Sequence, residues 1–268
     1  MWGHQSPRQS SLPVNPPLVK ITALQKRYGQ GAVILDDINL EFEKGEFVSL
    51  IGPSGCGKST LLKLIASLSP VTSGSLVVDG MTPENAREEM AFIFQEPTLL
   101  PWRTVTRNIE LPLEVLHTKW DKREEICART RKLVGLDHVP DHYPRQLSGG
   151  MKMRVSIARA LSLSPKILLL DEPFGALDEM TRDRLNEQLL AIREQQKFTA
   201  FFVTHSVAEA VFLSSRIIVL AANPGRVYQD IRVPFAYPRS AETRESPEYQ
   251  RCVAEVTKVL RAVNPDHP

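Results

Sequence analysis

The sequence contains little cysteine and no long apolar run. Its three cysteines, Cys56, Cys127 and Cys252, are odd in number and far apart, so we expect reduced thiols of a cytosolic protein rather than a disulfide framework. The longest apolar candidates, at 167–170 and 217–222, are strand-sized and fall far short of the ~20 residues that a membrane-spanning helix needs. These two shortages argue against a disulfide-rich and a membrane-spanning protein.

An excess of charge of one sign is also missing. Lys plus Arg (33) nearly balances Asp plus Glu (31), so the composition gives no reason to expect a nucleic-acid partner. The N-terminal stretch MWGHQSPRQSSLPVNPP lacks the apolar core of a secretory signal. Its Pro, Ser and Gln content predicts a disordered leader at residues 1–17. The remaining length suffices for one large domain or two intimate subdomains.

Apolar runs predict strands along most of the chain, at 18–28, 34–42, 47–51, 74–78, 90–94, 167–171, 200–204 and 216–221. Helical spacing of leucine and isoleucine predicts a helix over 61–68, and a second helix is expected between 178 and 196. Asp79 and Gly80 predict a hairpin turn. Strands that alternate with helices imply an α/β fold with a mainly parallel sheet covered on both faces.

Two regions depart from this alternation. Between about 103 and 159, charged helical patterns replace the strands, which predicts a helical insertion. From Pro224 onward the chain is rich in proline and charge, and it predicts either a small extra element or a partly disordered tail.

The motif GPSGCGKS at 52–59 matches G-x-x-x-x-G-K-[ST] in full, between a predicted strand and a predicted helix. Its glycines let backbone N–H groups curl around phosphate oxygens, and the following helix N-terminus favours anions. Lys58 would supply a positive charge to the β- and γ-phosphates, and the Ser59 hydroxyl would bind Mg²⁺. A chance glycine-rich turn is the alternative, and the strand–loop–helix context disfavours it.

The buried run ILLLDE at 167–172 ends in two acidic residues. Ligands lie at the carboxyl ends of parallel strands, so Asp171 is predicted to hold Mg²⁺ through water. Glu172 is placed to orient or activate a water for attack on the γ-phosphate. Alone, the pair would fit a strand capped by solvated acids. Together with the glycine-rich loop, it predicts an ATP-hydrolysing site.

The motif LSGGM at 147–151 precedes a helical run. Ser148 would then be a helix N-cap, and the same geometry with Gly149 and Gly150 would also make an anion site. The motif by itself leaves both interpretations open.

In combination, these motifs resemble the ATP-binding subunit of an ABC transporter, over roughly 18–227. LSGGM is similar to the family signature, although Met151 stands where the family usually has Gln. Tyr28 resembles the aromatic residue that stacks on adenine, Gln95 the glutamine that touches Mg²⁺, and His205 the switch histidine that contacts the γ-phosphate. The loop GALD at 175–178 resembles the one that couples two subunits.

Each of these residues has an ordinary structural alternative. Tyr28 alone would be a half-buried strand aromatic, Gln95 a strand-end cap, Asp178 a helix N-cap, and His205 a structural histidine. Their joint occurrence at the expected strand ends favours the functional interpretation.

The resemblance implies a P-loop NTPase (RecA-like) core with a mainly parallel sheet, an antiparallel β subdomain and an inserted α-helical subdomain at about 97–160. ATP and Mg²⁺ are the implied ligands. The implied catalytic residues are Glu172, His205 and Lys58, and the implied metal ligands are Ser59, Gln95 and Asp171. The implied nucleotide-binding residues are Tyr28, Gly52, Pro53, Ser54, Gly55, Cys56, Gly57, Lys58, Ser59, Thr60, Gln95, Ser148, Gly149, Gly150 and Asp178.

The resemblance also implies an ATP-dependent head-to-tail homodimer, in which Ser148, Gly149 and Gly150 serve the partner's ATP. The stretch QEPTLLPWRTV at 95–105 is similar to importers of the nitrate, sulfonate and taurine group. Leu100, Pro101 and Trp102 would then face the coupling helix of a membrane permease, or Trp102 would pack internally.

Such a subunit is expected at the cytoplasmic face of the membrane, with a permease and, indirectly, a solute-binding protein as partners and without nucleic acid. The expected organisation is a leader (1–17), the ATPase domain (18–227) and a C-terminal accessory segment (228–268). The competing interpretations are an ABC ATPase of DNA maintenance, which would carry coiled coils, one of translation, which would carry two cassettes, and a P-loop kinase, which would lack LSGGM.

Overall fold

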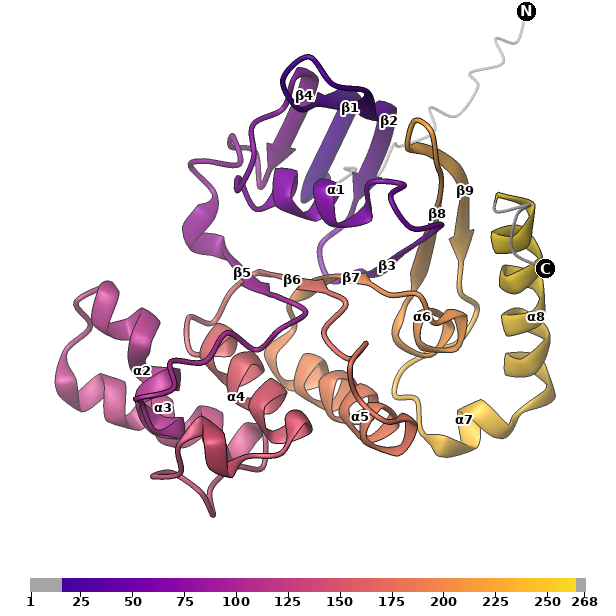
Figure 1. The fold of residues 1–268 in the computed structure, drawn as a ribbon. Helices are drawn as coiled ribbons and strands as arrows, with labels where there is room; N and C mark the ends of the chain where they lie inside the picture. Colours follow the sequence, from indigo (N-terminus) through magenta and orange to yellow (C-terminus); the bar gives the residue numbers. More distant parts are fainter. Residues whose placement is uncertain (1–15, 264–268) are drawn as a thin grey trace, which may run out of the picture.

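The computed structural model describes residues 16–263 (Figure 1). Of the leader expected at 1–17, residues 1–15 therefore lie outside the described part. The strands are β1 (Val19–Arg27), β2 (Val33–Phe42), β3 (Phe47–Ile51), β4 (Ser73–Val78), β5 (Met90–Ile93), β6 (Ile167–Asp171), β7 (Thr199–Val203), β8 (Arg216–Ala221) and β9 (Arg226–Arg232). The α-helices are α1 (Lys58–Ile65), α2 (Val105–Val115), α3 (Trp120–Leu133), α4 (Gly149–Leu161), α5 (Glu179–Gln196), α6 (Val207–Leu213), α7 (Ala241–Glu245) and α8 (Pro247–Ala262).

The larger sheet has six strands in the order β5-β6-β7-β3-β8-β9. Its first five strands are parallel to their neighbours, and β9 pairs antiparallel with β8. Every residue of β3, β6 and β7 is buried, as continuous apolar runs predict for strands covered on both faces. The predicted parallel sheet is confirmed.

The two faces of this sheet support two hydrophobic clusters. Alternate residues of each strand point to opposite faces, so Phe47 and Ile51 of β3 join one cluster while Val48 and Leu50 join the other. The first cluster contains residues of α4, α5 and α6, and the second contains α1 and the smaller sheet. Figure 1 shows these elements on opposite sides of the strands.

The smaller sheet is antiparallel, with the order β2-β1-β4. The predicted hairpin turn at Asp79–Gly80 forms, because Val78 and Met81 exchange backbone hydrogen bonds of 2.8 and 2.9 Å across it. Among the described residues no second strand extends this hairpin, and β4 pairs with β1 instead. The helix predicted to reach Leu68 ends at Ile65, and Ser67 adopts a left-handed backbone (φ 55°) that leaves Leu68 exposed.

The helical region lies between β5 and β6, where α2, α3 and α4 pack on one another and a short 3₁₀ turn spans Pro144–Gln146. Another 3₁₀ turn, Arg87–Glu89, directly precedes β5. In Figure 1, α2 and α3 project to one side of the sheet. No helix among residues 16–263 is long and apolar enough to cross a membrane.

The C-terminal region is ordered through residue 263, as β9, α7 and α8. This result decides between the two expectations for the segment from Pro224, in favour of extra structural elements. Sequence patterning missed β9 because it is an edge strand with no fully buried residue. The expected boundary between 227 and 228 falls inside this strand.

Candidate nucleotide-binding site

The glycine-rich loop follows β3 and leads directly into α1. Lys58 folds back into this loop, where its Nζ donates to the carbonyls of Gly52 and Pro53, both at 2.9 Å. Gly57 has a left-handed backbone (φ 97°), and a Cβ there would meet Leu35 Cδ2 at 2.5 Å. Glycine is therefore required at this position by both conformation and space. The ammonium group of Lys58 is held where the loop can close around an anion.

Asp171 ends β6 beside the start of α1. The Ser59 hydroxyl donates to Asp171 Oδ1 at 2.6 Å. Burial raises the pKa of the Asp171 carboxyl, and the hydrogen bond from Ser59 opposes that shift. A buried carboxylate next to a hydroxyl supplies the oxygen ligands that Mg²⁺ prefers. Residues 16–263 contain no cluster of three or more His, Cys, Asp or Glu that could hold a metal.

Glu172 and His205 meet across two neighbouring strands. Glu172 directly follows β6 and has a left-handed backbone (φ 48°), which is strained for a residue with a side chain. His205 lies two residues beyond β7, and its Nε2 is 2.7 Å from Glu172 Oε1. The pairing of β6 with β7 brings the two side chains together.

One cavity of about 380 Å³ gathers nine of the predicted residues, together with Ile34, which the sequence did not single out. They are Tyr28, Ser54, Gly55, Gly57, Lys58, Ser59, Thr60, Glu172 and His205. Gln95 lies outside this cavity. It lines an adjoining space of about 320 Å³ that shares Glu172 and His205. Gly52 and Pro53 line a third space with Ser54 and His205, and Cys56 is buried in the loop.

The remaining predicted residues form a separate group at the starts of α4 and α5. Ser148 accepts a hydrogen bond from the Met151 backbone N–H at 3.3 Å, and Asp178 accepts one from Thr181 N at 2.9 Å. Both are therefore N-caps. Hydrogen bonds from the backbone and the side chain of Thr181 lower the pKa of the Asp178 carboxyl. A Cβ on Gly150 would meet Thr181 Cγ2 at 2.7 Å, so the two helix starts lie in contact. None of this group lines the cavity around Lys58.

Thr204 and Glu209 were missed from the sequence, yet they hold the backbone on both sides of His205. The Thr204 hydroxyl donates to Glu209 Oε2 at 2.5 Å and accepts from Ser206 N at 3.0 Å. Ser206 Oγ in turn accepts from Glu209 N. Burial raises the pKa of Glu209. The S-x-x-E pattern at 206–209, typical of a helix-capping box, was the available signal.

Comparison with known proteins places this geometry in a family. Residues 35–175 match the family model described as ABC transporter. An aliphatic sulfonates import ATP-binding protein (SsuB) of Bacillus cereus is 46% identical over 83% of this chain and 87% of its own length. An uncharacterized ABC transporter ATP-binding protein of Methanocaldococcus jannaschii is 44% identical, over 89% of each chain.

Among solved structures, the dimeric post-hydrolysis state of the ATP-binding cassette MJ0796, bound to ADP and Pi, aligns with a TM-score of 0.72. The two chains are 33% identical, and the match covers 81% of this chain and all of that one. The fold, the loop around Lys58 and the extent of these matches all indicate the same family. The chain therefore belongs to the ABC transporter family, of which it is an ATP-binding subunit.

Proposed function

We propose that this chain hydrolyses ATP to power import of a small organic anion of the sulfonate class. The observation that carries the proposal is the single cavity that brings Lys58, Ser59, Glu172 and His205 together, with Asp171 bonded behind it. The solute class rests on the similarity to the sulfonate import protein of Bacillus cereus and on the stretch at 95–105.

ATP binding is assigned to the loop and its flanks. Backbone N–H groups of 52–60 and the Lys58 ammonium bind the phosphates, and Tyr28, half exposed at the cavity, stacks on the adenine. Ser59 and Asp171, joined by Gln95 from the adjoining cavity, would hold Mg²⁺, which neutralises charge that develops on the phosphates.

Hydrolysis is assigned to Glu172 and His205. The Glu172 carboxylate orients an attacking water and accepts its proton. His205, 2.7 Å from that carboxylate, fixes its direction and contacts the γ-phosphate. The strained backbone of Glu172 is the kind of outlier that persists where geometry serves a function.

The second group of residues serves another copy of the chain. Ser148, Gly149, Gly150 and Asp178 lie apart from the Lys58 cavity, so one chain presents two incomplete halves of a site. In a head-to-tail dimer, the start of α4 would face the partner's ATP, and its helix N-terminus would favour the phosphate charge.

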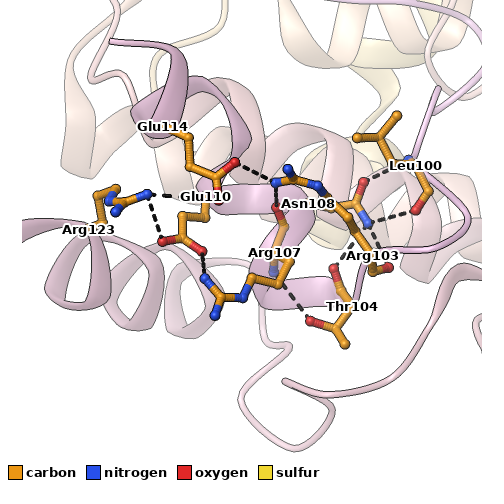
Figure 2. Close-up of polar contacts among 8 residues, drawn as sticks. All are labelled: Leu100, Arg103, Thr104, Arg107, Asn108, Glu110, Glu114 and Arg123. Atoms are coloured by element: carbon orange, nitrogen blue, oxygen red, sulfur yellow. Dashed lines mark hydrogen bonds and ion pairs between the residues drawn. The ribbon is translucent and has the colours of Figure 1, made fainter. Parts of the chain in front are cut away.

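A coupling surface for a permease is assigned to the loop before α2. Trp102 is 71% exposed, which favours the surface interpretation of this residue. Figure 2 shows how buried Asn108 holds the loop: its Oδ1 accepts from Leu100 N (2.8 Å), and its Nδ2 donates to the carbonyls of Leu100, Arg103 and Thr104. Nearby, β5, α2 and α4 line an apolar groove of about 690 Å³.

The remaining assignments follow from this role. The chain would sit at the cytoplasmic face of the membrane through its permease, and a solute-binding protein would choose the solute. The unit at 18–227, with its helical part at about 97–160, would be the motor. Against a DNA-maintenance role, the longest helix among residues 16–263 is α5, with 18 residues, far short of a long coiled coil.

Transport measured in a reconstituted complex tests this proposal. The permease that co-purifies with the chain, its solute-binding protein and the chain itself are placed in proteoliposomes with ATP inside. We expect ATP-dependent uptake of an alkanesulfonate and no uptake with the Lys58→Ala chain. Uptake of amino acids or sugars alone would refute the solute class, and failure to co-purify with any permease would refute the transport role.

A further inference from the structure

Helix α6 begins two residues after His205 and has seven residues. A helix this short is not stable by itself in water, so its position depends on what packs around it. Its first turn is held by the N-cap Ser206, whose Oγ accepts from Glu209 N at 3.3 Å. Beyond that turn, α6 packs on β3, α5 and α8. Helix α8 belongs to residues 233–263, defined here as the C-terminal brace.

Two side chains of the brace cap the carboxyl end of α6. The last carbonyls of a helix lack partners within it. Tyr237 Oη donates to the carbonyl of Leu213 at 2.6 Å. Arg239 Nη1 donates to three more carbonyls, those of Val211 (2.9 Å), Phe212 (2.9 Å) and Ser214 (3.0 Å). The orphan carbonyls of α6 are thus satisfied from outside the ATPase core.

Arg239 is a charged group in an unusual place. It is 5% exposed, burial lowers its pKa, and among the described residues its hydrogen bonds go to backbone carbonyls rather than to a carboxylate. A buried cation is unfavourable unless it is well bonded, and here it sits at the negative end of the helix dipole. Its contacts therefore tie the brace specifically to α6.

Helix α8 holds the other side of α6. Tyr249 Oη donates to the carbonyl of Ala208, in the first turn, at 2.7 Å. Cys252 and Val256 of α8 are buried in the same cluster as α6. Figure 1 shows α8 alongside α6, on the side away from α5, and α6 contacts both helices.

The brace also reaches the nucleotide site. Leu260, near the end of α8, lines the third space described above, of about 380 Å³. It does so with Ile51 at the end of β3, residues 52–54 of the glycine-rich loop, Thr204 and His205. The segment therefore contacts the helix that follows His205 at both ends and borders the space that His205 itself occupies.

We propose that the C-terminal brace positions His205 for hydrolysis by fixing α6, with Tyr237, Arg239 and Tyr249 as positioning residues. This inference rests on the proposed role of His205. Loosening of α6 would disturb the 2.7 Å contact between His205 and Glu172, and misplacement by about 1 Å can reduce a rate by about 100-fold. ATP binding would be largely spared, because α1, which begins at Lys58, packs on the face of the sheet opposite to α6.

Two substitutions of graded severity test the brace in the full chain. Tyr237→Phe removes only the hydroxyl that caps Leu213, and Arg239→Met removes the guanidinium but keeps the stem. We expect kcat to fall about threefold and about tenfold, with the Kd of a fluorescent ATP analogue within about twofold of wild type. The matched control is Arg123→Met, which removes a half-buried arginine that ties α3 to α2 and should lower Tm without lowering kcat.

A double-mutant cycle with His205→Ala separates positioning from mere stability. If the brace acts through His205, Arg239→Met should cost little further in single-turnover rate once His205 is absent. The proposal would be overturned if the two substitutions lowered the single-turnover rate by independent, fully additive amounts. It would also be overturned if kcat of the brace variants stayed at the wild-type value while Tm fell. If His205→Ala alone leaves kcat unchanged, the proposed role of His205 fails instead, so the two failures are distinguishable.

Discussion

At the scale of one residue, Glu172 is the carboxylate to which the proposed function assigns the hydrolysis step. We expect Glu172→Gln to lower ATP hydrolysis by at least about 100-fold, because the amide cannot accept the proton of the attacking water. The amide keeps the size of the side chain, so ATP binding should persist, and an ATP-dependent dimer should accumulate on size-exclusion chromatography. Phosphate release and binding of a fluorescent ATP analogue measure the two effects.

The control for this variant is Glu41→Gln, which alters an exposed carboxylate paired with Lys20 and should leave the rate at the wild-type value. Hydrolysis by the Glu172→Gln protein at the wild-type rate would remove Glu172 from the mechanism.

The alkylation rate of the Cys56 thiol is a measure of ATP binding at the glycine-rich loop. Burial raises the pKa of its thiol, and Lys58 only partly opposes this. The reactive species is the thiolate, so alkylation should be slow at pH 7 and should accelerate as the pH rises beyond the range of an ordinary thiol. Bound ATP covers the loop and should slow labelling further at every pH.

Peptide mass spectrometry resolves this labelling residue by residue. Cys127 is the internal reference, because it is buried in α3, away from the cavity, and burial raises its pKa to about 11. ATP should leave its labelling unchanged. Equal labelling of Cys56 with and without ATP would contradict the placement of this residue in a phosphate loop.

Single residues differ in how well sequence predicts them. Lys58, Ser59, Asp171 and Glu172 belong to motifs whose residue types are dictated by phosphate chemistry, and the structure brings them together. Glu209 belongs to no such motif. Its contact with Thr204 depends on the turn between β7 and α6, and a buried carboxylate five residues away is not visible as a partner until that turn is known.

At the scale of elements, buried strands are predicted best. The runs at 167–171 and 216–221 match β6 and β8 residue for residue, because strands buried on both faces are apolar throughout. Edge elements are predicted worst. β9 has two half-buried residues, Val227 and Ile231, among five exposed ones, and α8 has its buried stripe of Tyr249, Cys252 and Val256 among charged residues. Their positions are decided by packing on β8 and α6 rather than by local pattern.

The loop before α2 is an element held largely by one side chain. We expect Asn108→Ala to lower the free energy of unfolding by about 2–3 kcal/mol, because four hydrogen bonds to a buried amide are lost and loop carbonyls are left without donors. Urea unfolding measures this loss. In the reconstituted complex, the permease should stimulate the ATPase less, since the loop that presents Trp102 is no longer fixed.

Asn39→Ala is the matched control, because the amide of Asn39 makes three hydrogen bonds, nearly as many as that of Asn108, but is exposed. Its loss of stability should stay within about 0.5 kcal/mol. A fully stimulated ATPase in the Asn108→Ala complex would show that the loop does not contact the permease.

At the scale of the whole molecule, the predicted site residues form two separate groups, one around Lys58 and one at the starts of α4 and α5. Glu172 and His205 of the cavity around Lys58 lie directly beyond β6 and β7. Ser148, Gly149 and Gly150 mark the start of α4 and Asp178 caps α5, and none of these four residues lines that cavity. The sequence motifs predicted each group, and the separation of the two groups in the fold supports the proposal that a second chain completes the site.

This division predicts complementation between two inactive chains. Lys58→Ala should lose ATP binding, and Ser148→Arg should block the partner's phosphate from the start of α4 while leaving its own loop intact. In a mixed dimer, the loop of the Ser148→Arg chain faces the intact Ser148 of the Lys58→Ala chain, so one complete site forms. Random mixing makes half of all dimers mixed. Each mixed dimer has one intact site instead of two, so the mixture holds about a quarter of the wild-type number of sites.

We therefore expect an equimolar mixture to regain up to about a quarter of the wild-type ATPase rate, well above either variant alone, provided that one site suffices for turnover. Ser148→Thr, which keeps the N-cap hydroxyl, should retain activity. An unchanged Tm and helix content of the Ser148→Arg chain would show that the arginine acts by obstruction rather than by unfolding α4. If the mixture gives only the average of the two inactive chains, while both chains bind each other in the presence of ATP, then each chain hydrolyses ATP with its own residues, and the start of α4 has no part in the partner's site.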